Sequence, residues 1–88
     1  MVEQQIKDFF VGPKFSESIG REGWLVYRGT LSSCVDAAGD APSAVAKAIK
    51  MAKFCMLGGH LAQVHLREGT DGPWSTVWCP PHQEPRFP

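Results

Sequence analysis

Cysteine and histidine are the residue types here that best suit metal binding or nucleophilic chemistry, and the chain has three of each. Cys79 and His82 are separated by two residues, a spacing that zinc sites use. His60 and His65 fall in the strand predicted before them. A structural zinc site needs four ligands, and only one cysteine lies in this stretch. A strand that ends at prolines explains the pattern more simply, so we expect no metal site.

Nucleophilic catalysis would require a thiol or hydroxyl within hydrogen-bond reach of a histidine base. Cys34 and Cys79 qualify by residue type, and Ser32 and Ser33 beside Asp36 offer a weaker possibility. No nucleophile elbow and no glycine-rich oxyanion loop accompanies them. We therefore predict no catalytic residues and no enzymatic activity, with a small Cys/His enzyme as the second alternative.

Phosphate or cofactor binding finds little support in the sequence. Gly58 and Gly59 follow the predicted helix, whereas phosphates bind at the N-terminal ends of helices. A glycine pair in this place indicates a helix stop. We expect no cofactor.

The charge balance gives no general sign of a nucleic-acid partner. Nine Lys and Arg balance nine Asp and Glu, so the formal net charge is zero, whereas nucleic-acid-binding domains are usually clearly basic. Lys47, Lys50 and Lys53 form a local basic arc on the predicted helix, which we interpret as a solvated face.

The cellular compartment is predicted from cysteine usage and the N-terminal residues. An odd cysteine count argues against a closed disulfide framework, so we expect reduced thiols. Residues 1–8 lack the apolar core of a secretory signal. No run reaches the roughly 18 apolar residues that a membrane helix needs. We expect a cytoplasmic protein without a membrane segment.

The elements that must position these residues can be read from hydrophobic periodicity and turn residues. They predict one helix and five strands, at residues 9–11, 24–28, 31–37, 41–57 (the helix), 60–66 and 74–79. The order β-β-β-α-β-β indicates an α+β fold, a two-layer sandwich with a short antiparallel sheet of four to five strands on one helix. We expect a single domain over residues 1–88 with an ordered core of about 7–80, flexible N-terminal residues and a flexible proline-rich tail.

The helix carries the strongest local signals. Asp40 is a good N-cap, and Pro42 falls in the first turn, where its missing N–H costs nothing. Apolar residues recur at helical spacing and define a core face: Val45, Ala48, Ile49, Ala52, Cys55 and Met56. The first strand, by contrast, is followed by Gly12 and Pro13, so we predict an edge strand there.

Aromatic residues on the strands form the most informative group. Side chains alternate along a strand, so parity assigns them to two faces. One consistent assignment defines a candidate binding face away from the helix, made of Tyr27, His65, Arg67, Trp74 and Trp78. The alternative places both tryptophans in the core, and the sequence leaves the two assignments open.

Several spaced motifs resemble those of a family of small bacterial domains of unknown function. They are Gly23-Trp24-x-Val26, the helix opened by Asp40, Ala62-x-Val64, and Asp71-Gly72-x-Trp74-x-x-x-Trp78. The resemblance spans residues 9–81 and implies the same order of elements, but no activity. The chain departs from the pattern at Ser43, where an acidic residue is common, and at Cys79-Pro80-Pro81, which replace a more polar ending.

The functional expectation follows from the aromatic face and the missing catalytic set. An open apolar face usually marks an interface, so we expect a non-enzymatic interaction or self-association module, with a homodimer or another protein as partner. The first alternative is a single-stranded nucleic-acid-binding domain that stacks bases on Trp or Tyr beside Arg67.

Overall fold

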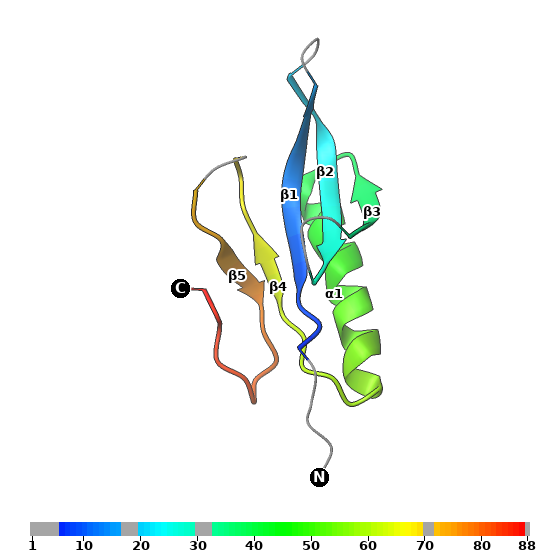
Figure 1. Ribbon diagram of the computed structural model, residues 1–88, viewed down its shortest axis with the longest axis vertical. Coiled ribbons are helices and arrows are strands. Elements are labelled where there is room, and N and C mark those ends of the chain that lie inside the picture. Colours follow the sequence, from blue (N-terminus) through cyan, green and yellow to red (C-terminus); the bar gives the residue numbers. More distant parts are fainter. Residues whose placement is uncertain (1–5, 17–19, 30–32, 70–71, 88) are drawn as a thin grey trace.

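The computed structural model describes residues 6–16, 20–29, 33–69 and 72–87. One helix packs on one face of a five-stranded sheet with the strand order β3-β2-β1-β4-β5 (Figure 1). The predicted α+β class and the order β-β-β-α-β-β are confirmed. The elements are β1 (Phe9–Ser16), β2 (Gly20–Arg28), β3 (Cys34–Ala38), α1 (Ala41–Leu57), β4 (Val64–Leu66) and β5 (Ser75–Trp78).

The helix begins and ends where its local signals predict. The Asp40 carboxylate accepts a hydrogen bond of 2.8 Å from the backbone N–H of Ser43, which satisfies an amide of the first turn. At the other end, Gly59 adopts a φ of 89° and donates to the carbonyl of Met56. A side chain at Gly59 would strain this left-handed conformation, so the glycine pair stops the helix.

The core lies between the helix and the sheet. Val11, Val26 and Val64 are fully buried on the sheet. They meet the fully buried Ala44, Ala48 and Ala52 of α1. The predicted helix face is confirmed in its direction, but its larger members are only half-buried, because three small alanines bring the helix axis close to the strands.

Strand β1 occupies the centre of the sheet, so the prediction of an edge strand is wrong. It pairs antiparallel with β2 and parallel with β4. The N–H of Phe9 and the C=O of Val11 both point toward β4, so the nitrogen of Pro13 points to the same side. Pairing with β4 ends at Val11, and Pro13 lies beyond it. The missing N–H therefore breaks no hydrogen bond.

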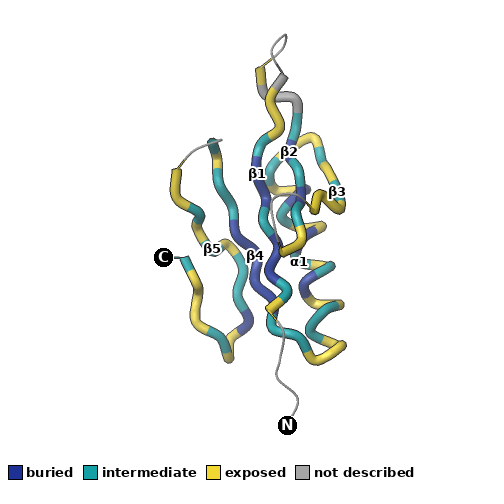
Figure 2. Tube along the Cα trace, viewed as in Figure 1, coloured by how far each residue is buried: buried dark blue, intermediate teal, exposed yellow. Residues whose placement is uncertain are grey.

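The parallel pairing of β1 and β4 departs from the expected antiparallel sheet. It arises because the chain leaves β3 at one edge and returns through α1 on the other side of β1. Parallel neighbours need such a crossover. Figure 2 shows that the run leading into β4 is deeply buried, since α1 covers one side of it and the C-terminal residues cover part of the other.

Among the described residues, no helix has both the length and the apolar character needed to span a membrane.

Candidate functional site

Four of the five predicted face residues lie on the side of the sheet away from α1. Tyr27 pairs with Phe10 across the β1–β2 ladder. Phe10 also contacts His65 and Trp74, with ring centroids 5.0 and 5.1 Å apart. The guanidinium of Arg67 lies 4.5 Å above the Trp74 ring. The Trp74 ring is thus contacted both by Phe10 and by Arg67.

Trp78 lies on the opposite side, against the core and the end of α1. Val64 pairs with Trp78, but the next residue, His65, pairs with Thr76, so Val77 is an extra residue in β5. This bulge reverses the alternation, because one inserted residue turns the rest of the strand over. The shared face predicted for Trp74 and Trp78 is therefore wrong, and no glycine or proline within β5 signals the bulge.

A buried polar cluster, which the sequence did not predict, lies on the helix-free side. His65 Nε2 donates to Asp8 Oδ2 over 2.6 Å. Arg86 donates two hydrogen bonds to the same carboxylate, from Nε to Oδ2 over 2.6 Å and from Nη2 to Oδ1 over 2.9 Å. The backbone N–H of Gln63 completes the set at 3.1 Å. Asp8 is 5% exposed and His65 is fully buried.

The electrostatics of the cluster keep Asp8 ionised. Burial alone raises the pKa of the Asp8 carboxyl, but the hydrogen bonds and charges of Arg86 and His65 outweigh it, so the pKa lies below its ordinary value. The hydrogen bond to Asp8 also raises the pKa of Arg86. Because the carboxylate only accepts, His65 must carry a proton on Nε2.

Thr76 extends the cluster on the other side of the histidine. Its Oγ1 lies 2.9 Å from His65 Nδ1 and accepts a hydrogen bond of 3.1 Å from the N–H of Phe87. Asp8, His65 and Thr76 are thus connected in the order of an acid–base–hydroxyl triad. Substrate has no visible access, however, because the Phe87 ring stands edge-on against His65 at 4.7 Å and the histidine has no exposed surface.

Residues 82–87, which we name the C-terminal strap, close this side of the sheet. The strap turns back beside β5 (Figure 1), and Phe87 accepts a backbone hydrogen bond from Thr76. The Gln63 side chain binds it twice, donating to the carbonyl of Glu84 and accepting from the N–H of Arg86. Cys79 donates its thiol proton to the carbonyl of Gln83. The sequence suggested a flexible tail, since it is rich in proline and lacks a hydrophobic period.

Sequence reasoning singled out His65 but missed its partners Asp8 and Arg86, because the contacts between them are long-range. Asp8 and Arg86 are 78 positions apart, and neither belongs to a local motif. The one available signal was the pair of polar residues, Gln63 and His65, that alternates with the apolar residues of a buried strand. Buried polar groups need partners, so this pair predicts a polar layer without saying what completes it.

The other predicted candidates are dispersed. Cys34 is exposed and Cys55 half-buried, and both are free thiols. Within the described part of the chain, no group of three or more His, Cys, Asp or Glu residues is arranged to hold a metal ion. The three lysines of the basic arc do not form one patch. Lys47 donates to the carbonyl of Ala37 over 2.8 Å and pairs with Asp36.

Both outer edges of the sheet carry blocking contacts. At β3, the N–H of Ala37 donates to the Asp36 carboxylate and its carbonyl accepts from Lys47. At β5, the N–H of Thr76 donates to Phe87 of the strap. Satisfied edge groups cannot pair with another strand, so these positions resist edge-to-edge association.

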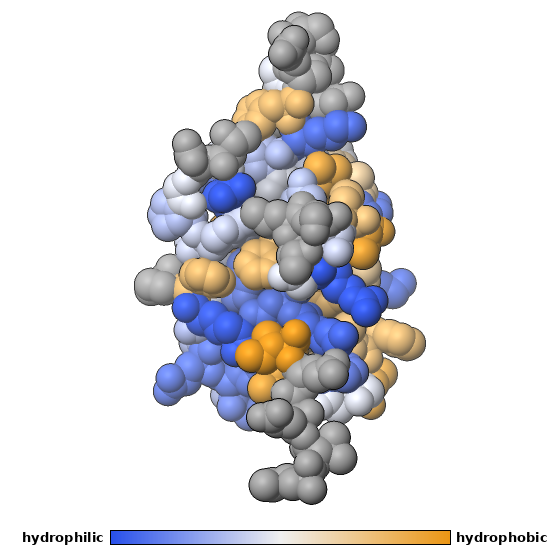
Figure 3. Space-filling model, viewed as in Figure 1, coloured by the Kyte–Doolittle hydropathy of each residue, from blue (hydrophilic) through white to orange (hydrophobic). Residues whose placement is uncertain are grey.

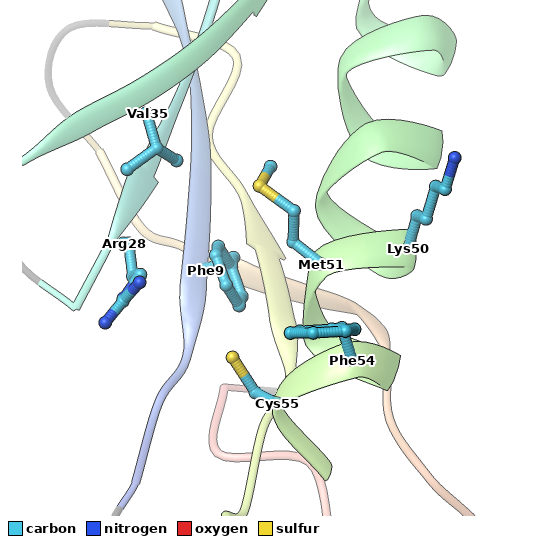
Figure 4. A pocket seen from close by; sticks show the side chains of 7 residues that line it. All are labelled: Phe9, Arg28, Val35, Lys50, Met51, Phe54 and Cys55. Atoms are coloured by element: carbon cyan, nitrogen blue, oxygen red, sulfur yellow. The ribbon is translucent and has the colours of Figure 1, made fainter. Parts of the chain in front are cut away.

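An apolar hollow of about 380 Å³ opens between α1 and the β1–β3 side of the sheet. We name it the α1 groove. Figure 4 shows Phe9, Met51, Phe54 and Cys55 around its floor, with Val35 on the opposite wall. Phe54 is 76% exposed and Val35 45% exposed. A smaller hollow continues from it and shares Arg28, Phe54 and Cys55 with it. Its other described lining residues are Lys7, Gly58 and His60.

Comparison with known proteins identifies no relative of this chain. No protein-family model matches the chain, and no curated protein and no solved structure matches it either. The resemblance to a family of small bacterial domains therefore stays a prediction.

Proposed function

We propose that this protein is a non-enzymatic interaction module that binds a partner protein through the α1 groove. The observation that carries the proposal is Phe54, a large apolar side chain that is 76% exposed beside a hollow of about 380 Å³. Apolar surface that borders a concavity and is rimmed by polar groups is typical of a binding site.

The helix-free face supports the proposal less well than the groove does. Its centre is covered by the strap, and His65 has no exposed surface. Trp74 already contacts Arg67 and Phe10, so a nucleic-acid base would have to displace one of them to stack on the indole. This disfavours the single-stranded nucleic-acid alternative.

Self-association is disfavoured by the blocked strand edges and by charge. An isologous dimer through the groove would place the cations Arg28 and Lys50 of one copy in the same interface as those of the other. Like charges that face each other across an interface weaken it. A different protein is therefore the better partner.

The triad-like arrangement of Asp8, His65 and Thr76 is closed to substrate, which disfavours an enzyme. Asp8, His65 and Thr76 lie in the right order, but their polar groups hold the strap and the sheet together. This use of the three side chains supports a structural role.

The test uses anilinonaphthalene sulfonate, an apolar anion of about the size of the groove, with backbone amide shifts of the full chain as the readout. We expect shifts concentrated at the groove residues, and their loss in Phe54→Ser. Leu57→Ser is the matched control, because Leu57 is 87% exposed on the same helix but borders a different hollow. Shifts confined to the helix-free face, or equal losses in both variants, would contradict the proposal.

A further inference from the structure

We infer that the α1 groove recognises an acidic amphipathic segment, in which apolar side chains enter the hollow and neighbouring carboxylates meet its rim. This inference rests on the proposed function and adds the chemical class of the partner. It is carried by the charged groups of the described residues around the groove, which are all cationic.

Among residues 6–16, 20–29, 33–69 and 72–87, those with charged side chains that line the two connected hollows are Lys7, Arg28 and Lys50, with His60 beside them. Figure 4 shows that Arg28 and Lys50 come from opposite walls, the first from the end of β2 and the second from α1, with their charged ends away from the apolar floor. A ligand in the groove would thus have cations on two sides. Acidic residues that flank an apolar anchor match this arrangement.

The acidic residues that the structure describes lie elsewhere. Asp8 holds the cluster under the strap, Asp36 pairs with Lys47, and Asp40 caps α1. None of the groove-lining residues for which the structure gives a position is acidic. Within the described part of the chain, the side chains of Lys7, Arg28 and Lys50 take part in no ion pair. Their charges are available to a partner.

The floor of the groove suits varied apolar side chains. Met51 and Cys55 contribute sulfur-containing groups, and methionine adapts its shape because it is unbranched and flexible. Phe54 supplies exposed, rigid aromatic surface beside them, and the buried Phe9 lies behind the floor. We therefore expect the apolar positions of the ligand to accept leucine, methionine or phenylalanine, while the acidic positions provide the selectivity.

Other anionic partners fit the hollow less well. An anionic bilayer would be attracted to the same cations, but it presents a flat surface that leaves a concave site unfilled. Single-stranded nucleic acid needs aromatic faces in series, and the groove has one exposed ring, that of Phe54. The experiment therefore tests binding of both as alternatives to the acidic segment.

The experiment measures binding of three matched peptides to the full chain by fluorescence anisotropy at low and high salt. The first alternates leucine with glutamate, the second replaces each glutamate by lysine, and the third keeps glutamate but replaces each leucine by serine. We expect the first peptide to bind at least about tenfold more tightly than the other two. Its binding should weaken as the salt concentration rises.

Charge removal at the rim should then reduce that preference. The double variant Arg28→Gln, Lys50→Gln should weaken binding of the acidic peptide by about three- to tenfold. The effect is modest because each exposed charge pair contributes little to the binding free energy. Lys53→Gln is the matched control, because Lys53 lies on the same helix but borders a different hollow, and we expect less than a twofold change.

The outcomes separate this inference from the proposed function. Equal binding of the glutamate and lysine peptides overturns the acidic class, even if anilinonaphthalene sulfonate still binds at the groove. Failure of both the peptide and that probe overturns the proposed function itself. Tighter binding of phosphatidylserine vesicles or of a single-stranded oligonucleotide, sensitive to the same rim variants, overturns the inference in favour of that partner.

Discussion

The two sides of this small protein treat their polar and apolar groups in opposite ways. On the helix-free side, Asp8, His65 and Arg86 form a buried network that holds the strap in place. On the other side, the α1 groove leaves Phe54 and Val35 in solvent, with cations around them. Figure 3 shows a related contrast on the face it presents: hydrophilic colours gather over the lower part of β4, β5 and the strap, and hydrophobic colours recur along the flank of α1 and β3.

The difference shows why residue type alone is a poor guide to function in this chain. Histidine and aspartate attract attention as catalytic residues, yet here they are buried and fully engaged, which favours a structural role. Phe54 and Lys50 of α1 have the residue types of an ordinary exposed helix face, yet they line an open hollow. This contrast should be visible in stability: substitutions on the strap side should change the free energy of unfolding strongly and those on the groove side weakly.

The largest effect is expected for Asp8→Ala. The substitution leaves the buried N–H of Gln63 and Nε2 of His65 without an acceptor and Arg86 without its counter-charge. We expect the free energy of unfolding to fall by about 3 kcal/mol in urea denaturation. Glu68→Ala, at an exposed position, should change it by less than about 0.5 kcal/mol. Similar values for both variants would show that the network contributes nothing.

A smaller loss is expected for Arg86→Ala, because Arg86 is partly exposed and Asp8 keeps two other donors. We expect the free energy of unfolding to fall by about 1–2 kcal/mol in urea denaturation. Hydrogen exchange at the Thr76 amide should become faster, because the strap is held less tightly. Arg86→Lys should recover only part of the loss, since lysine cannot make the two parallel hydrogen bonds of the guanidinium. Full recovery by lysine would argue against the bidentate contact.

Acid should weaken the same network. The pKa of Asp8 in the folded protein lies below the ordinary 3.8, so its stabilising effect is complete above that value and is lost as the pH falls through the folded pKa. We expect wild type to lose more stability than Asp8→Asn below pH 3.8, as measured by urea unfolding at successive pH values. The pKa values of Asp36 and Asp40 are also lowered, by backbone hydrogen bonds from Ala37 and Ser43, but both groups are common to the two proteins and cancel. Parallel pH profiles would contradict the role of Asp8.

The smallest effect on stability is expected for Phe54→Ser. Because this side chain is 76% exposed, its removal should change the free energy of unfolding by less than about 0.5 kcal/mol while it abolishes binding of the apolar probe. A loss above about 2 kcal/mol would show that Phe54 supports the core, and the contrast between the two sides would then disappear.

Local sequence determined the helix and the side of the sheet on which it packs. The Asp40 cap, the apolar spacing and the Gly58-Gly59 stop depend on interactions within one or two turns, so they can be read without knowing the fold. The alternation that placed Tyr27 and His65 away from the helix is equally local, and the structure agrees with it.

Tertiary structure alone decided the central position of β1, the turned-over Trp78 and the strap. Each depends on which strand lies beside which: β1 gains β4 through the crossover, β5 takes an extra residue against β4, and Arg86 meets Asp8 from 78 positions away. Contacts between distant segments depend on the whole packed arrangement and leave little local pattern, because they form only after the chain has folded. The sequence therefore determined the elements and their buried faces, while the fold decided which face was closed by the chain itself and which was left open.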